Sequence, residues 1–66
     1  MRVDLDLKLV GEGAAFQDGM HSIETARILR AMADAIFEGT EGHFDLRDIN
    51  GNYVGSCVFD AWTEDD

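Results

Sequence analysis

The amino-acid sequence predicts an α+β fold, a small β-α-β-β domain in which one helix packs on one face of a three-stranded antiparallel sheet. Three observations predict this fold class. Apolar residues alternate with charged ones over residues 2–9, a helical period of 3.6 follows over residues 22–38, and alternation returns on both sides of an Asn-Gly turn at residues 50–51. A chain of 66 residues has room for a single domain, 1–66, with a thin core.

The first expected strand covers residues 2–9. Side chains two positions apart in a strand point to the same face, so the apolar set is expected to face the core and the charged set to face solvent. The inward set is Val3, Leu5, Leu7 and Leu9, and the outward set is Arg2, Asp4, Asp6 and Lys8. Glycine and aspartate residues then interrupt any period over about ten residues, which predicts a loop that Phe16 anchors.

A helix is predicted over residues 22–38, with Ser22 as its N-cap and Gly39 as the left-handed residue after its last turn. Leu29 and Ile36 lie near the middle of the apolar arc and are expected to be its main core residues. The arc consists of Thr25, Leu29, Met32, Ala33 and Ile36, with Ala26 and Ile28 at its edges. The arc expected to face solvent consists of Glu24, Arg27, Arg30, Asp34 and Glu38.

A hairpin is predicted after the helix. Residues 43–47 alternate, residues 48–52 form a turn that accepts positive φ at Gly51, and residues 53–62 form the second arm. Gly55 and a shift of the apolar phase after it indicate a β-bulge, which leaves the inward face of this arm open. Residues 63–66 are expected to be a frayed acidic tail.

Composition excludes several classes of protein. The chain has 14 acidic residues against 5 lysines and arginines, a formal net charge of −9, which argues against nucleic-acid binding through a basic patch. Cys57 is the one cysteine, so an intramolecular disulfide and a cysteine-based zinc site are excluded, and a reducing cytoplasm is the expected environment. Carboxylates near the N-terminus and the lack of a long apolar run predict a protein that is neither secreted nor inserted in a membrane.

No motif of the sequence points to catalysis, a metal or a cofactor. A calcium loop around the hairpin turn would need ligands at Leu46 and Cys57, so a plain turn is the better interpretation. Cys57 lies in an apolar stretch and is expected to be a buried hydrophobe rather than a nucleophile. His21 and His43 are expected on the surface, and residues 11–13 lack the lysine of a phosphate loop. We therefore expect a non-enzymatic protein.

The distribution of the acidic residues suggests a function. The helix, 22–38, has three carboxylates against two arginines, so −8 of the net −9 lies outside it. Carboxylates two apart on a strand are about 6.6–6.8 Å apart, and such rows on a rigid sheet can imitate a nucleic-acid backbone and occupy a basic channel. The alternative is that the acidity only keeps a small protein soluble. Asp45 of the second expected strand is predicted to join Asp4 and Asp6 on the solvent face of the sheet. The expected partner-binding residues are Asp4, Asp6, Asp45 and Asp48.

Residues 24–34 and 46–55 resemble a widespread group of small phage and prophage proteins, and the resemblance covers about half of the chain. Among small acidic phage products, the chain is similar to anti-CRISPR proteins of the DNA-mimic kind. The resemblance implies that the protein binds a bacterial CRISPR effector, or another basic nucleic-acid-binding protein, in the host cytoplasm and blocks its DNA. It supports the fold more than the activity, and it assigns no functional residue by position.

A second hypothesis stays open. The protein could be a small structural or adaptor protein of a phage that acts through apolar contacts or self-association. Both hypotheses expect no direct contact with nucleic acid or membrane, and a monomer or weak homodimer. Salt distinguishes them, since ions screen charge docking but leave apolar association intact.

Overall fold

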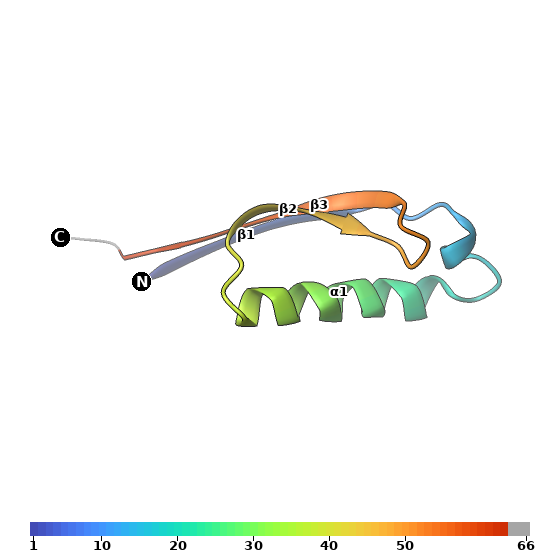
Figure 1. Ribbon diagram of the computed structural model, residues 1–66, viewed down its shortest axis with the longest axis horizontal. Helices are drawn as coiled ribbons and strands as arrows, with labels where there is room; N and C mark the ends of the chain where they lie inside the picture. Colours follow the sequence, from blue (N-terminus) through green and yellow to red (C-terminus); the bar gives the residue numbers. More distant parts are fainter. Residues whose placement is uncertain (64–66) are drawn as a thin grey trace.

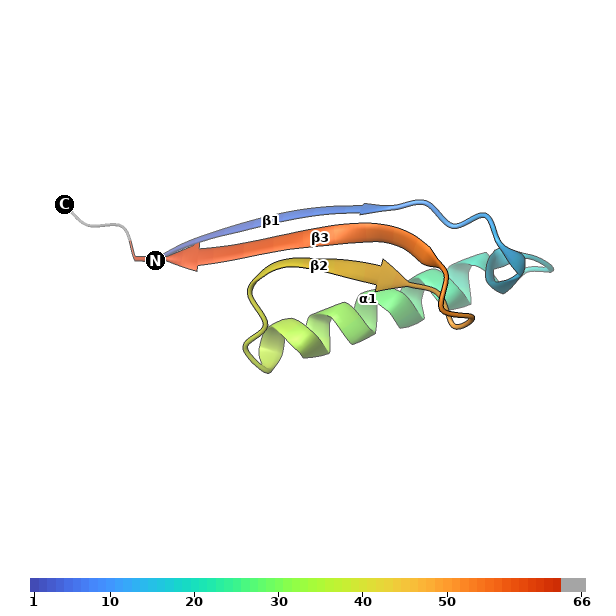
Figure 2. The same ribbon diagram turned by 45° about the horizontal axis from the view of Figure 1, so that its top comes forward.

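A computed structural model describes residues 1–63 and shows one helix over a three-stranded antiparallel sheet (Figures 1 and 2). This is the α+β fold, with the β-α-β-β order, that the sequence predicts. The elements are β1 (Arg2–Leu9), a short 3₁₀ turn η1 (Ala14–Phe16), α1 (His21–Phe37), β2 (Gly42–Arg47) and β3 (Tyr53–Trp62). The predicted boundaries of the helix and strands agree within one residue, and the last three residues of the predicted tail lie outside the described part.

The last strand of the chain lies in the middle of the sheet, in the order β1-β3-β2, and pairs antiparallel with both neighbours. Leu7 is paired with Cys57, and Cys57 with Phe44, so these three side chains share one face. We call it the inner face because α1 lies on that side (Figure 1). The other face, the outer face, has no helix on it within residues 1–63 and carries the charged residues of β1.

The helix starts earlier than the sequence suggests. The Met20 carbonyl accepts the first helical hydrogen bond, from the Glu24 N–H at 2.8 Å, and Met20 is the N-cap without a side-chain cap. The prediction that Ser22 caps the helix is therefore wrong, because Ser22 already lies inside the first turn. The prediction for the other end is confirmed, since Gly39 follows the last turn with φ +108°.

The buried face of α1 is rotated by about a quarter turn from the predicted arc. Ile28, expected at the edge, is only 3% exposed, and Glu24, expected on the solvent side, is 4% exposed. Leu29, expected in the middle, is 37% exposed. The predicted assignment of Glu24 and Leu29 is therefore wrong, and the reason lies in the polar contacts of Glu24 described below.

The hairpin turn has the conformation that its sequence predicts. The Asp48 carbonyl accepts the Gly51 N–H at 2.9 Å, and the Asp48 N–H donates to the Asn52 carbonyl at 2.9 Å. Gly51 has φ +85°, the left-handed conformation that follows the first turn of a three-residue hairpin loop. The turn therefore closes through its own backbone and needs no ion.

A β-bulge resolves the phase of β3. Leu46 is paired with Gly55 while Arg47 is paired with Tyr53, so Val54 has no partner on β2. The bulge turns Val54 into the core, and from Gly55 onward the odd-numbered residues face inward. The bulge that Gly55 suggested is thus confirmed. The buried core is small and consists of Phe16, Ile28, Leu46, Val54 and Cys57.

The sheet continues beyond the helix as a two-stranded arm. β2 begins opposite Phe59, so residues 2–4 of β1 and 60–62 of β3 pair only with each other within the described residues. Figure 2 shows this arm reaching past the end of α1 toward the N-terminus. The arm carries its side chains with both faces open, and Val3 on its inner face is 59% exposed.

Candidate functional site

Three carboxylates meet on the outer face of the arm and the strand that leads into it. Asp4 and Asp6 are two residues apart on β1, and Asp60 of β3 is paired directly with Asp4. All three are exposed. We call Asp4, Asp6 and Asp60 the carboxylate cluster. The outer-face positions predicted for Asp4 and Asp6 agree with the register. Asp60 was missed because the sequence did not show which side chains of residues 53–62 face inward.

The carboxylate cluster is flanked on the outer face of β1 by two basic residues, Arg2 beside Asp4 and Lys8 beside Asp6. None of its three side chains forms a hydrogen bond or an ion pair with residues 1–63. At the tip of the arm the Arg2 guanidinium lies over the Trp62 ring, 5.6 Å from its centroid. Like charges directly opposite each other destabilise a pair of antiparallel strands, so Asp4 and Asp60 cost stability where they are.

Asp45 lies on the same face but outside the cluster. It is paired with Ser56 of β3, and β3 separates it from β1. Its carboxylate oxygens lie 3.8 Å from Arg47 Nη2 and 4.0 Å from His43 Nε2. The expectation that Asp45 joins Asp4 and Asp6 is right about the face and wrong about the proximity, because strand order places the third strand between them.

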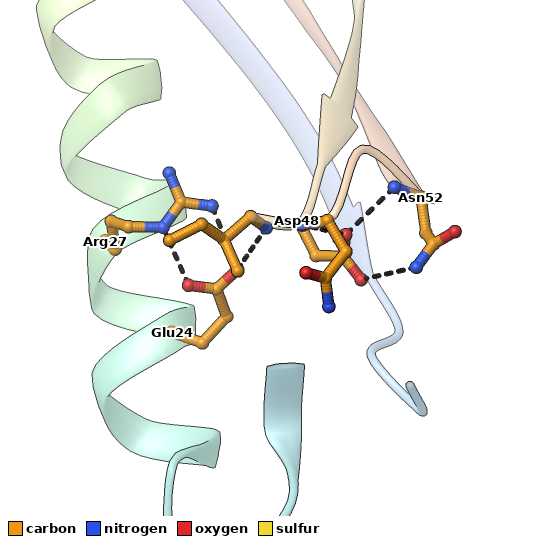
Figure 3. A network of polar contacts seen from close by, with 6 residues as sticks. Glu24, Arg27, Asp48 and Asn52 are labelled. Atoms are coloured by element: carbon orange, nitrogen blue, oxygen red, sulfur yellow. Dashed lines mark hydrogen bonds and ion pairs between the residues drawn. The ribbon is translucent and has the colours of Figure 1, made fainter. Parts of the chain in front are cut away.

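Asp48 is not a surface residue. Its side chain is buried inside the hairpin turn, where Oδ1 accepts the N–H groups of Asn50 and Asn52 at 2.9 Å each. Oδ2 accepts the Asn52 side-chain amide at 3.2 Å (Figure 3). These bonds hold the turn in shape. The expected role of Asp48 in partner binding is therefore incompatible with its position.

A second acidic side chain, Glu24, connects the helix to this turn. Its Oε1 accepts Arg27 Nε at 2.7 Å and its Oε2 accepts Arg27 Nη2 at 2.9 Å, a two-point ion pair. Oε2 also accepts the Ile49 N–H at 2.7 Å (Figure 3). The helix is thus fixed to the hairpin by a buried carboxylate. The sequence offered no signal for it, since Glu24 and Arg27 at i,i+3 also fit an exposed pair.

Both turn-region carboxylates titrate below their ordinary range. The hydrogen bond from Arg27 lowers the pKa of Glu24, burial opposes the shift, and the Ile49 N–H supports it. Burial raises the pKa of Asp48, but its bonds from Asn52 and Asn50 outweigh that effect and leave the pKa lowered. The arrangement is structural, because in the described part of the chain every buried side-chain nitrogen or oxygen has a hydrogen-bond partner within the protein.

Acid is therefore expected to loosen the link between helix and turn. Since folding lowers both pKa values, the stabilisation is complete above the unfolded values, near pH 4, and is lost as the pH falls through the folded ones. Glu24→Gln should lower the thermal midpoint at pH 7 by roughly 5 °C or more and flatten its fall between about pH 5 and 2. Circular dichroism melts across this range measure both effects.

Glu41→Gln is the matched control, since it removes the same charge from an exposed position. It should leave the midpoint at pH 7 and its pH dependence close to those of the parent. Equal behaviour of the two variants would show that the bonds of Glu24 do not stabilise the fold.

The remaining chemical candidates are the cysteine thiol and a possible metal site, and the described residues support neither. Cys57 is fully buried, and burial together with the nearby Asp6 raises the pKa of its thiol, which disfavours the reactive thiolate. Among residues 1–63 no three His, Cys, Asp or Glu side chains are gathered to hold a metal, and no helix there has the length and apolarity to cross a membrane.

Comparison of the chain with protein families, curated proteins and solved structures finds no match.

Proposed function

We propose that the protein is a non-enzymatic inhibitor that docks its carboxylate cluster into a basic groove of a nucleic-acid-handling protein. The resemblance of the sequence to DNA-mimic anti-CRISPR proteins suggests a bacterial CRISPR effector as that partner, met in the host cytoplasm. The observation that supports the proposal is the cluster itself, three exposed carboxylates that form no ion pair within residues 1–63, on the projecting arm and the part of β1 that leads into it.

The cost of the cluster to folding favours a role in binding. Asp4 faces Asp60 across the strand pair, where an uncharged residue would be more stable. A partner with lysines and arginines relieves this repulsion when it binds, so the loss of the repulsion adds to the free energy of binding. Solubility alone would be served equally well by exposed carboxylates that do not face one another across a strand pair, such as Asp34 and Glu41.

The test is the triple variant Asp4→Asn, Asp6→Asn, Asp60→Asn. The fold should be kept or slightly stabilised, because repulsion is removed, while affinity for the partner should fall at least about tenfold. Coulomb attraction of one close pair is about 4 kcal/mol at an effective dielectric of 20, before desolvation and entropy are subtracted. The assay measures displacement of labelled DNA from purified CRISPR effectors, at low and high salt.

A matched triple, Asp34→Asn, Glu38→Gln, Glu41→Gln, removes three exposed charges near the end of the helix. It should displace DNA nearly as well as the parent. If both triples lose activity equally, net charge is responsible rather than the cluster. If neither does, docking through carboxylates is wrong.

The adaptor hypothesis also has one observation in its favour. Large apolar side chains are exposed, with Phe37 at 92%, Val3 at 59% and Leu5 at 50%. A protein that acts through them would bind its partner as well at high salt as at low salt. The salt series of the displacement assay therefore decides between the two functions.

A further inference from the structure

The outer edge of β1 is open. Among residues 1–63 this strand has a neighbour on one side only, because β3 lies between it and β2. The helix contacts the sheet mainly at β2, and the views of Figures 1 and 2 agree that no other described segment lies along the far side of β1. An edge of this length is a template for another strand.

The hydrogen-bond phase shows which backbone groups face the open side. The Val10 N–H donates to the Val54 carbonyl at 2.7 Å, which continues the register of β1 and β3. In an antiparallel ladder the direction of bonding alternates with every residue, so the even residues of β1 bond to β3. The N–H and C=O groups of the odd residues therefore point to the open side.

The charges of β1 lie in an order that makes register decisive for pairing with a second copy. We define the outer row as Arg2, Asp4, Asp6 and Lys8, which has its positive charges at the ends and its negative charges in the middle. Two copies related by a two-fold axis perpendicular to the sheet pair their β1 strands antiparallel, with the outer rows side by side on one face. The row has no net charge, so the position of each charge decides which pairing is stable.

Most registers of two such strands set like charges opposite each other, which is destabilising. Centred on Leu5, the strands set Asp4 of one copy opposite Asp6 of the other. Centred on Asp4, Asp6 or Lys8, they set that residue opposite itself. Centred on Val3, they pair only the end of the strand.

The register centred on Leu7 avoids these clashes and pairs residues 4–10 of the two copies. It sets Asp6 opposite Lys8 of the other copy, twice by symmetry, and no like charges face each other. Opposed side chains of a strand pair lie about 4.5–5.5 Å apart at Cβ, within reach of an ion pair. Neither side chain has a hydrogen bond or ion pair within residues 1–63 that it would have to give up.

The same register matches the apolar side chains of the inner face. Leu5 lies opposite Leu9 of the other copy, and Leu7 lies opposite itself. In the single copy Leu5 is 50% exposed, and Leu9 is half-buried toward the other end of the strand. Each exposed leucine thus gains an apolar neighbour across the junction.

We propose that the protein forms a dimer in which the β1 strands of two copies pair antiparallel about Leu7 and join the two sheets into one. Both helices then lie on one side of the joined sheet and both carboxylate clusters lie on the other, because opposed residues of a strand pair share a face. The inference does not rest on the proposed function, since it needs the backbone edge of β1 and holds whatever the outer face binds.

Salt separates this association from face docking. The net charge of −9 on each copy opposes association over long distances. At about 0.15 M salt the Debye length is about 8 Å, which screens this repulsion but spares the closer pairs across the junction. The dimer should therefore strengthen as salt is raised from low values, whereas docking of the carboxylate cluster into a basic groove should weaken.

The test exchanges the two paired charges. Asp6→Lys and Lys8→Asp, made singly, set like charges opposite each other and should raise the dimer dissociation constant at least about tenfold. The double variant keeps the net charge of −9, restores unlike pairs and should dimerise like the parent. The two single variants, mixed, should form a heterodimer, because each lysine then faces an aspartate. Sedimentation equilibrium at about 0.15 M salt measures all four cases.

Glu41→Lys is the matched control, since it changes the net charge as Asp6→Lys does at an exposed position outside β1. It should not weaken the dimer. Both exchanged positions are level with uncharged residues of β3, Val58 and Ser56, so the fold of a single copy should be kept. Single variants that dimerise like the parent, or a double variant that does not, overturn the register and with it the proposal.

Amide exchange in the unmodified protein gives a second readout that does not depend on the variants' folding. Raising the protein concentration through the dimer dissociation constant should slow exchange at Leu5 and Leu7 by about tenfold, while Asp6, already bonded to β3, changes less. A parent that stays monomeric at about 1 mM, or a dimer in which Leu7 exchanges as in the monomer, overturns pairing through β1. Neither result touches the displacement of DNA, which tests the proposed function separately.

Discussion

Gly55→Ala is expected to abolish the cooperative unfolding transition. A Cβ atom built on Gly55 would lie far inside the van der Waals contact distance of the Lys8 carbonyl oxygen and 3.0 Å from the Leu9 Cα. Both are backbone atoms of the strand paired with β3, so neither moves unless β1 and β3 separate. Overpacking against side chains typically costs about 1–3 kcal/mol, and a clash between paired backbones exceeds that in a domain with little stability in reserve. Thermal melts by circular dichroism measure the loss.

Gly13→Ala is the control for this prediction. Gly13 has φ −79° and ψ −175°, which any residue adopts, and its added Cβ would lie 3.7 Å from the nearest atom, Asp48 Oδ2. The midpoint should stay close to that of the parent. A Gly55→Ala protein that melts like the parent would mean that β1 and β3 approach less closely than the structure has them.

The first strand and the hairpin turn were predictable because one local feature of the sequence decides each of them. Alternation of apolar and charged residues places Leu7 inward and Asp6 outward in β1 without any knowledge of its neighbours. Gly51 likewise carries the positive φ of its turn in its own residue type. These are local properties, so they can be deduced from the sequence wherever no contact from elsewhere in the chain overrides them.

The helix face was not predictable because Glu24 is held from outside the helix. A wheel counts this residue as polar and turns it toward solvent. In the structure its carboxylate takes the Ile49 N–H of the hairpin turn together with the Arg27 guanidinium, which compensates its burial. A contact between residues 25 positions apart leaves no mark on helical periodicity.

The candidate site was predictable only where the position of a residue follows from a local pattern. Asp4 and Asp6 follow from the alternation of β1, whereas Asp60 needs the register of β3, which a bulge shifts. Asp45 needs the strand order, and Asp48 needs the closed geometry of its turn. Asp60 and Asp45 thus depend on pairing between segments, which a single sequence does not state, whereas the bonds of Asp48 are local to its turn.

Ile28→Ala is expected to destabilise the protein by about 2–5 kcal/mol, and Leu29→Ala by much less. Ile28 belongs to the buried core at 3% exposure, where truncation loses apolar burial and leaves a cavity. Leu29 is 37% exposed and keeps part of its surface in water already. The two residues are neighbours of equal side-chain volume. Alanine gains more helix propensity over isoleucine than over leucine, which works against the expected order, so a larger loss for Ile28→Ala reports burial. Urea denaturation of both variants measures this difference in the free energy of unfolding, with the parent's slope of free energy against urea concentration used for all three proteins. If Leu29→Ala proves the more costly, the apolar arc of the sequence is the true core face and the link between Glu24 and the hairpin turn does not orient α1.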